Sequence, residues 1–468
     1  MSRFSLVYIG IFSAIISILS FFNVIYSNYF NLYLNIDCYV YSLIVSLIFG
    51  LIFLFKKKEE TKITIYEKII TVILGYLILP IFISIPYYFS IYNITFINAY
   101  FEAVSGFTST GFSIFENIKH LDESLILWRS SSQWVGGLYF LFSIILLIDI
   151  FDSNLKKSLT NLLSFNTSEA LKQSFKILIL YTSLTFLVFL VLNFSNIRYF
   201  NSFNLAMTVI SSGGFIPSNN LENILNNKTK EIIFSFTMLI SFFSLFLSYN
   251  ILTIKKKDVS YFQEDLYLAI YFCFLVAIFF LLSNFDYNFS EIFLSLCSSI
   301  SNIGLSTNNS YQNITILFLI ITIIGGSFFS TSSGIRFIKL FSLFRFSINE
   351  LVSHAKPFNV FINKFEFSNS KFETKEINKY FISLIIFIIS LFILSSLLTI
   401  SGIDIESAFK LSILTLMNTV NSSMHGLASF NFEELDYITK YYLIFFMIIG
   451  RVELLTILII LKKFLFKN

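Results

Sequence analysis

Charged residues are scarce in this sequence. Asp, Glu, Lys and Arg make up only 13% of its 468 residues, whereas 56% are hydrophobic and the mean hydropathy is +0.78. In soluble domains roughly 25% of the residues are charged. The composition therefore excludes a soluble globular protein and indicates an integral membrane protein.

Cysteine is rarer still, and the three residues Cys38, Cys273 and Cys297 are too few and too scattered for a disulfide framework or a zinc site. Catalytic motifs are also missing: the apolar runs contain no HExxH pair, no Ser/His pairing at a sensible spacing and no aspartate dyad. No phosphate-binding glycine fingerprint follows a strand. We therefore expect no enzyme activity, no cofactor on this chain and no nucleic-acid partner, with membrane lipid around it.

Long apolar runs dominate what is present. A membrane-spanning helix needs about 20 apolar residues, and the first run is too long for a signal peptide. Ten runs meet this length and are predicted as spans: 5–26, 37–55, 67–92, 123–151, 173–194, 231–254, 265–284, 313–343, 378–400 and 434–463. Four shorter apolar segments have a helical pattern but cannot cross, so we expect them to be re-entrant: 97–108, 199–210, 290–301 and 404–417.

The lysines and arginines near the span ends predict the orientation. The basic clusters at 56–62, 155–157, 255–257, 334–345 and 461–467 fall on one side if the ten spans alternate. Positive charge marks the cytoplasmic side. The re-entrant segments therefore enter from outside, and the polar connection at 344–378 is cytoplasmic, either as a docking surface or as a plain linker.

A fourfold internal repeat appears after the first two spans. Each repeat contains a span, a short helix, a polar loop and a second span. The loops read "FEAVSGFTSTGFS" (101–113), "FNLAMTVISSGGFIPS" (203–218), "FLSLCSSISNIGLST" (293–307) and "FKLSILTLMNTVNSSMHGLAS" (409–429). Gly111, Gly214 and Gly304 lie ten or eleven residues after the first Phe, and the same count in the fourth loop ends near Asn421, with Gly426 too far along.

Irregular backbone at membrane depth is tolerated only where protein shields it or where it lines a watery path. Four such loops at the C-terminal ends of short helices predict a common site, where helix dipoles and exposed carbonyls replace the water around a cation. No ring of carboxylates accompanies them, which favours a monovalent ion. The alternative for any single loop is close packing of small residues. A secondary transporter with two inverted repeats fits the fourfold spacing less well.

Several motifs carry a family resemblance over nearly the whole chain. They are "LWRSSSQWVGG" (127–137), "STGF" (109–112), "SGGF" (212–215), "GGSFFSTSSGIRFIK" (325–339) and "GRVELLTIL" (450–458). With these motifs the sequence resembles the Trk/Ktr/HKT superfamily of potassium transporters, more closely the bacterial Trk-system membrane subunits of the TrkH/TrkG type. The two spans that precede the repeats favour the Trk type over the shorter Ktr type.

The resemblance implies an all-α membrane protein, multi-pass in the bacterial cytoplasmic (inner) membrane, that takes up potassium through one pseudo-fourfold pore. It divides the chain into two N-terminal helices (1–62), repeats 1 to 3 (63–172, 173–258 and 259–345), a cytoplasmic linker (346–377) and repeat 4 (378–468). It also implies a homodimer and a cytosolic nucleotide-binding regulatory ring of the TrkA type. Alternatives within this fold are a sodium/potassium cotransporter, entry coupled to protons, and a weakly selective monovalent cation channel.

The resemblance also implies site residues. Potassium would bind at a filter of backbone carbonyls formed by Thr108, Ser109, Thr110, Gly111, Ser211, Ser212, Gly213, Gly214, Ser301, Asn302, Ile303, Gly304, Thr419, Val420 and Asn421. A gate below the filter would be formed by Gly325, Gly326, Ser327, Ser330, Thr331, Gly334 and Arg451. The sequence departs from the family at Asn421, which takes the place of a glycine, and at Phe329 and Ser333, which should stiffen the gate loop.

Ionisable residues inside apolar runs are expensive and by default functional. Arg451 and Glu453 lie within the last span, two residues apart, so they cannot share a helix face. We expect Arg451 to face the pore or the gate loop; a structural bond to a neighbouring repeat is the alternative. Arg129, near the outer start of its span, can extend its charge to the membrane surface, and we assign it no role. His425 either senses the outside pH or is an ordinary surface residue.

Overall fold

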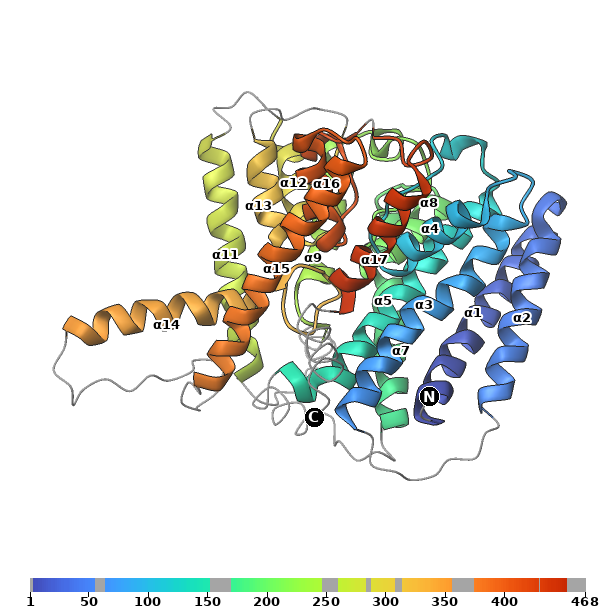
Figure 1. The fold of residues 1–468 in the computed structure, drawn as a ribbon. Coiled ribbons are helices and arrows are strands. Elements are labelled where there is room, and N and C mark those ends of the chain that lie inside the picture. The colour runs from blue at the N-terminus through green and yellow to red at the C-terminus, as the bar shows by residue number, and fades with distance from the viewer. Residues whose placement is uncertain are drawn as a thin grey trace.

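A computed structural model describes residues 3–54, 64–151, 170–245, 260–282, 288–307, 314–355, 374–428 and 430–452. This part of the chain is almost entirely helical (Figure 1). The helices are α1 (Arg3–Tyr29), α2 (Ile36–Leu54), α3 (Ile65–Tyr88), α4 (Phe96–Phe107), α5 (Glu123–Phe151), α7 (Ala170–Phe194), α8 (Tyr199–Ile210), α9 (Lys228–Phe242), α11 (Ser260–Leu282), α12 (Phe289–Ile300), α13 (Thr315–Ile323), α14 (Phe337–Ala355), α15 (Thr374–Ile400), α16 (Ile405–Leu416) and α17 (Tyr437–Val452).

Shorter elements connect them. Four single-turn 3-10 helices are η1 (Tyr33–Asn35), η2 (Ile118–His120), η3 (Leu221–Asn223) and η4 (Ser423–His425). Within the described residues the strands are β1 (Ile324–Gly325) and β2 (Ile335–Arg336), which pair in parallel. The prediction of an all-α membrane protein is confirmed.

Seven helices of the described part are long and apolar enough to cross a membrane. They cover Val7–Tyr29, Tyr33–Leu54, Ile65–Tyr88, Glu123–Leu147, Lys176–Phe194, Glu264–Leu281 and Ile377–Ile400. Each corresponds to one of the ten predicted spans, so the chain is a multi-pass membrane protein. Of the other three predictions, 434–463 begins as α17, and its residues from 453 onward, Glu453 included, lie outside the described residues.

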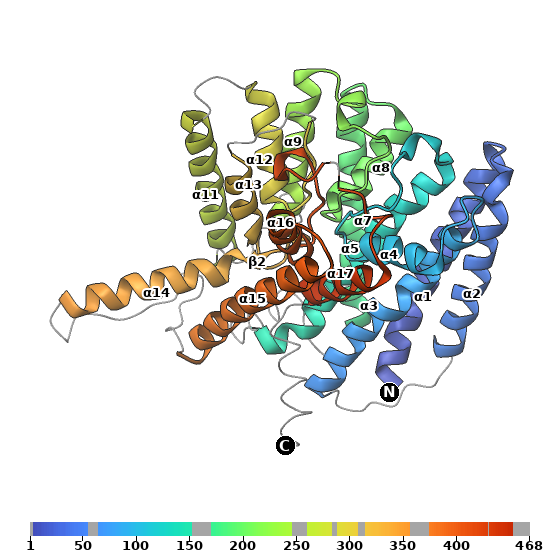
Figure 2. The same cartoon turned by 45° about the horizontal axis from the view of Figure 1, so that its top comes forward.

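The predicted span 313–343 is wrong as a continuous helix. Helix α13 has only nine residues, a buried loop follows, and α14 then leaves the bundle sideways (Figures 1 and 2). The predicted span 231–254 is interrupted in the same region, because α9 ends at Phe242. There the buried loop takes over the helix hydrogen bonds: Ser327 N donates to Phe242 O over 3.0 Å, and Ser332 N donates to Ser241 O over 3.2 Å.

The four re-entrant helices are confirmed as helices with boundaries within about one residue of the predicted ones. α4, α8, α12 and α16 each have 12 residues. Polar caps help two of them to begin: Thr95 accepts a hydrogen bond from Asn98 N, and Asp404 accepts one from Ser407 N. All four lie in the upper half of the bundle in Figure 1.

Each short helix lies between two other helices in the chain, giving the units α3–α4–α5, α7–α8–α9, α11–α12–α13 and α15–α16–α17, of which α13 with nine residues is shorter than α12. The helices α1 and α2 form a hairpin at one edge of the bundle (Figure 2), and α1 packs on α3 and α5. The four units repeat the predicted order. The domain boundaries between them stay predictions.

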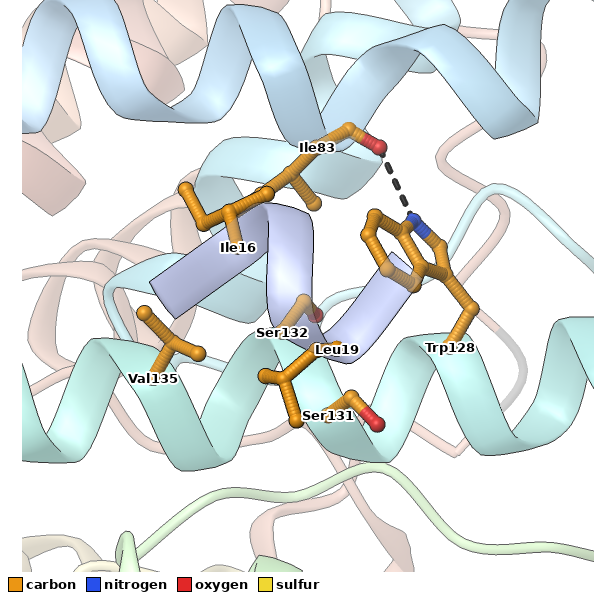
Figure 3. A pocket seen from close by; sticks show the side chains of 7 residues that line it. All are labelled: Ile16, Leu19, Ile83, Trp128, Ser131, Ser132 and Val135. Carbon is orange, nitrogen blue, oxygen red and sulfur yellow. Dashed lines mark hydrogen bonds between the residues drawn. The ribbon is translucent and has the colours of Figure 1, made fainter. Parts of the chain in front are cut away.

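A small pocket lies between α1, α3 and α5 (Figure 3). Its polar groups are already engaged: Trp128 Nε1 donates to Ile83 O over 3.0 Å, and Ser131 and Ser132 donate to carbonyls of their own helix. The serine hydroxyls of this pocket are therefore not free to coordinate a cation. Its lining residues are Ile16, Leu19, Ile83, Trp128, Ser131, Ser132 and Val135.

Candidate functional site

The four short helices end with the same backbone geometry. Two residues after the helix, the chain enters the left-handed region at Ser109, Ser212, Asn302 and Asn418, with φ between 48° and 58°. Ser and Asn are unusual there, since this conformation is costly for most side chains. The repeated turn gives the four loops one direction and one register.

Counted from these helix ends, the fourth residue of each loop is Gly111, Gly214, Gly304 and Val420. The prediction that Asn421 stands opposite the three glycines is therefore wrong by one residue. Matching the run "TVN" to a family motif shifted the register, because letters alone do not show where α16 ends. Asn421 instead donates from Nδ2 to Leu427 O over 3.0 Å and braces the following segment.

The four loops meet at Val420. A Cβ on Gly111 would lie 2.8 Å from Gly214 Cα and 3.0 Å from Val420 Cβ, and a Cβ on Gly214 would overlap the Val420 side chain. A Cβ on Gly304 would lie 2.6 Å from Val420 O. The three glycines are thus required by the close approach of neighbouring loops. Gly426 lies away from this meeting point, since the atom nearest to a Cβ on Gly426 would be Lys410 Nζ.

Side-chain amides join neighbouring loops. Asn418 Nδ2 donates to Thr110 Oγ1 over 3.0 Å, and Asn302 Nδ2 lies 3.4 Å from Thr419 Oγ1. The loop residues are fully buried or nearly so. Within the described part of the chain, no hydrogen bond is accepted by the carbonyl oxygens of Ser109, Thr110, Gly111, Ser212, Gly213, Gly214, Asn302, Ile303 and Gly304.

The predicted gate segment forms a buried loop between β1 and β2. Gly325 and Gly334 lie back to back at its base, where a Cβ on Gly334 (φ +77°) would lie 2.8 Å from Gly325 Cα. The loop holds Gly326, Ser327, Ser330 and Thr331. Thr331 Oγ1 lies 3.4 Å from Ser212 Oγ, which joins this loop to the second filter loop.

Two charged residues that sequence reasoning missed hold the gate loop in place. Arg336 donates from Nη1 to Ser327 O (3.1 Å) and Ser332 O (3.0 Å) and is buried. Glu264 on α11 accepts from Phe328 N (3.0 Å). Arg336 belongs to the basic cluster at 334–345 that predicts the orientation, and its place in a Gly/Ser-rich apolar run was the signal that could have identified it.

Arg451 lies between the gate loop and two filter loops, as predicted for a residue that faces them. Its Nη1 donates to Ser333 Oγ, and Nη2 lies 3.5 Å from both Ser109 Oγ and Ser211 O. The guanidinium stacks on Phe140 at 3.8 Å from the ring centroid. A buried positive charge therefore stands at the inner end of the loops.

The prediction that Arg129 extends to the membrane surface is wrong. Its side chain is 1% exposed and pairs with the buried Glu102, with Nε 2.9 Å from Oε1. The pair lies behind the first loop, where the Glu102 carboxylate replaces water as the hydrogen-bonding partner of the buried guanidinium.

His425 is buried, which contradicts the surface alternative. It follows the fourth loop outside the membrane-spanning helices, and burial lowers the pKa of its imidazole to about 3. The side chain is therefore neutral throughout the physiological range, which removes the basis for a pH sensor at this position.

No family model matches the chain. It is 24% identical over 462 residues to a protein described as an uncharacterized cation transporter from Methanocaldococcus jannaschii, covering 94% of this chain and 91% of that protein. It is 23% identical over 424 residues to the Trk system potassium uptake protein TrkH of Escherichia coli, covering 86% of each.

The fold is similar to the crystal structure of the potassium transporter TrkH from Vibrio parahaemolyticus, with a TM-score of 0.83, 19% identity and 98% coverage of both chains. Both the sequence matches and the fold thus extend over nearly the whole chain. The chain therefore has the TrkH fold and is similar over nearly its whole length to Trk-system potassium uptake proteins, as its motifs predict.

Proposed function

We propose that this chain is the ion-conducting subunit of a Trk-type system and takes up potassium across the cytoplasmic membrane. One observation carries the proposal: buried carbonyl oxygens that accept no hydrogen bond within the described part of the chain lie in three of the four loops that converge from the helix ends. A buried carbonyl without a partner is costly. A dehydrated cation supplies that partner.

The charge around the loops favours a monovalent cation. The C-terminal ends of α4, α8, α12 and α16 direct partial negative charge toward the meeting point. No Asp or Glu belongs to the filter residues themselves, and the nearby Glu102 is neutralised by Arg129. Carbonyls and hydroxyls without carboxylates replace the hydration shell of a monovalent ion without binding a divalent ion tightly.

Conduction then depends on the gate loop and Arg451 beneath the filter. Ions that leave the four loops toward the cytoplasm meet the Ser333 hydroxyl and the Arg451 guanidinium, which contact each other. Movement of the loop between β1 and β2 would open this path. The relatives are Trk-system proteins, and we propose a homodimer that docks a cytosolic nucleotide-binding ring of the TrkA type.

Growth of a potassium-uptake-deficient bacterium on limiting potassium tests the function. Cells with the wild-type chain, together with its regulatory partner, are expected to grow, and Gly214→Asp is expected to abolish growth because an added side chain overlaps Val420. Gly402→Asp is the matched control, since nothing lies within 4 Å of the Cβ position of Gly402. No rescue by the wild type, or full rescue by Gly214→Asp, would count against the proposal.

The fourth loop offers a test of ion preference. Because Val420 takes the position of the glycines, Val420→Gly is expected to change the ratio of rubidium to sodium uptake, whereas Asn421→Gly is expected to leave it close to wild type. Tracer uptake into cells that express equal amounts of each variant measures the ratio. The opposite pattern would restore Asn421 as the fourth filter position.

A further inference from the structure

The buried carboxylate of Glu102 ties the segment after the first filter loop back to its own short helix. Glu102 lies in α4 and is 0% exposed. It accepts a hydrogen bond from Ile114 N over 2.9 Å and one from Ser113 Oγ over 3.2 Å. The segment that follows the filter residue Gly111 is thereby tied to α4 at Ile114, three residues later.

Arg129 on α5 extends this connection to the second loop. Its Nε donates to Glu102 Oε1 over 2.9 Å, and Nη2 donates to Ser113 Oγ over 2.8 Å. Its guanidinium lies 4.1 Å from the ring centroid of Phe215, the residue that follows Gly214. One helical turn further along α5, Gln133 Oε1 accepts from Phe215 N over 3.2 Å.

Among the residues that the structure describes, this arrangement occurs behind the first short helix alone. Glu102 is the seventh residue of α4, and the seventh residues of α8, α12 and α16 are Leu205, Ser295 and Leu411. None of these can pair with an arginine as a carboxylate does. The first and second loops are therefore held together by an ionic brace, which the seventh residues of the other three short helices cannot form.

We propose that the Glu102–Arg129 pair is a positioning element that sets the spacing between the first and second filter loops and thereby discriminates potassium from smaller monovalent cations. The proposal rests on the proposed function of the loops. Discrimination by a carbonyl cage requires that the oxygens keep their distance when a smaller ion enters. A fixed guanidinium between the two loops opposes that collapse, because it contacts Ser113 on one side and Phe215 on the other.

A double variant separates positioning from plain stability. Each single neutral substitution leaves an uncompensated buried charge and is expected to lower the amount of protein in the membrane, whereas Glu102→Gln with Arg129→Met removes both charges and restores it. We expect the rubidium-over-sodium uptake ratio of this double variant to fall about ten-fold, the effect of one lost hydrogen bond to a charged group. Glu123→Gln with Arg198→Met is the matched control, since that pair (2.8 Å) is exposed, and its ratio should stay unchanged.

The outcomes distinguish the two proposals. A double variant at normal membrane level with an unchanged ratio overturns the positioning role and leaves the pair structural. If the double variant does not accumulate, Arg129→Lys decides: it keeps the charge beside Glu102 but loses the planar stacking on Phe215, so an unchanged ratio overturns the inference. Absence of rubidium uptake by the wild type would instead contradict the proposed function.

Discussion

Replacing Gly304 by alanine is expected to abolish potassium uptake while the protein still reaches the membrane. Gly304 has a φ of +82°, and the new Cβ would lie 2.6 Å from Val420 O and 2.9 Å from Val420 N. The left-handed conformation alone costs an alanine roughly 1–2 kcal/mol. The Cβ would also lie 2.7 Å from Thr419 Cγ2, and the overlap with the Val420 backbone can be relieved only by moving the fourth loop.

The matched control is Gly402→Ala. Gly402 has a φ of +91°, so it carries a similar conformational cost, but nothing lies within 4 Å of its Cβ position. Uptake by this variant should remain close to wild type in a rubidium uptake assay at equal expression. Normal uptake by Gly304→Ala would show that the meeting of the four loops does not limit conduction.

Replacing Arg451 by methionine is expected to raise basal uptake by about ten-fold or more. A potassium ion at the inner end of the loops would lie on the order of 5 Å from the guanidinium, where two unit charges repel each other by roughly 3 kcal/mol at an effective dielectric constant of about 20. Methionine keeps much of the packing on Phe140 and removes the charge. Rubidium influx without the regulatory partner measures the change.

Arg451→Lys tells the two possible causes apart. Lysine keeps the positive charge but cannot bond Ser333 and the two filter loops together with a planar group. If charge forms the barrier, the lysine variant stays as slow as wild type; if the hydrogen bonds hold the gate loop closed, it becomes as fast as methionine. Unchanged influx in both variants would remove Arg451 from the gate.

The short helices could be predicted from the sequence because their signals are local. Each is a run of about 12 apolar residues, too short to span, that ends at a polar stretch with small residues. Nearly all the information for α4 or α12 therefore lies within its own segment. The convergence of the loops followed from a physical rule, since unshielded backbone at that depth has to meet partners.

The broken span at 313–343 could not be predicted by hydropathy. The gate loop contains Phe328 and Phe329, which are buried in protein and not in lipid, and a count of apolar residues does not distinguish the two surroundings. The termination of α9 at Phe242 depends on Ser327 and Ser332, which lie almost 90 residues later in the chain.

Within the site, partners distant in the sequence were the main omission. Arg129 lies 27 residues after Glu102, and nothing local indicates that the two meet. The register of the fourth loop was missed for a different reason: Val420 and Asn421 are adjacent, and only the end of α16 decides which of them faces the glycines.

All four filter loops belong to one polypeptide, and this has a genetic consequence. In an assembly of four identical subunits a single codon change alters every quarter of the site at once. Here it alters one quarter, as Val420 and the Glu102–Arg129 pair illustrate. Ion preference in this chain can therefore evolve through single substitutions, each of which changes one filter loop while the other three loops keep their structure.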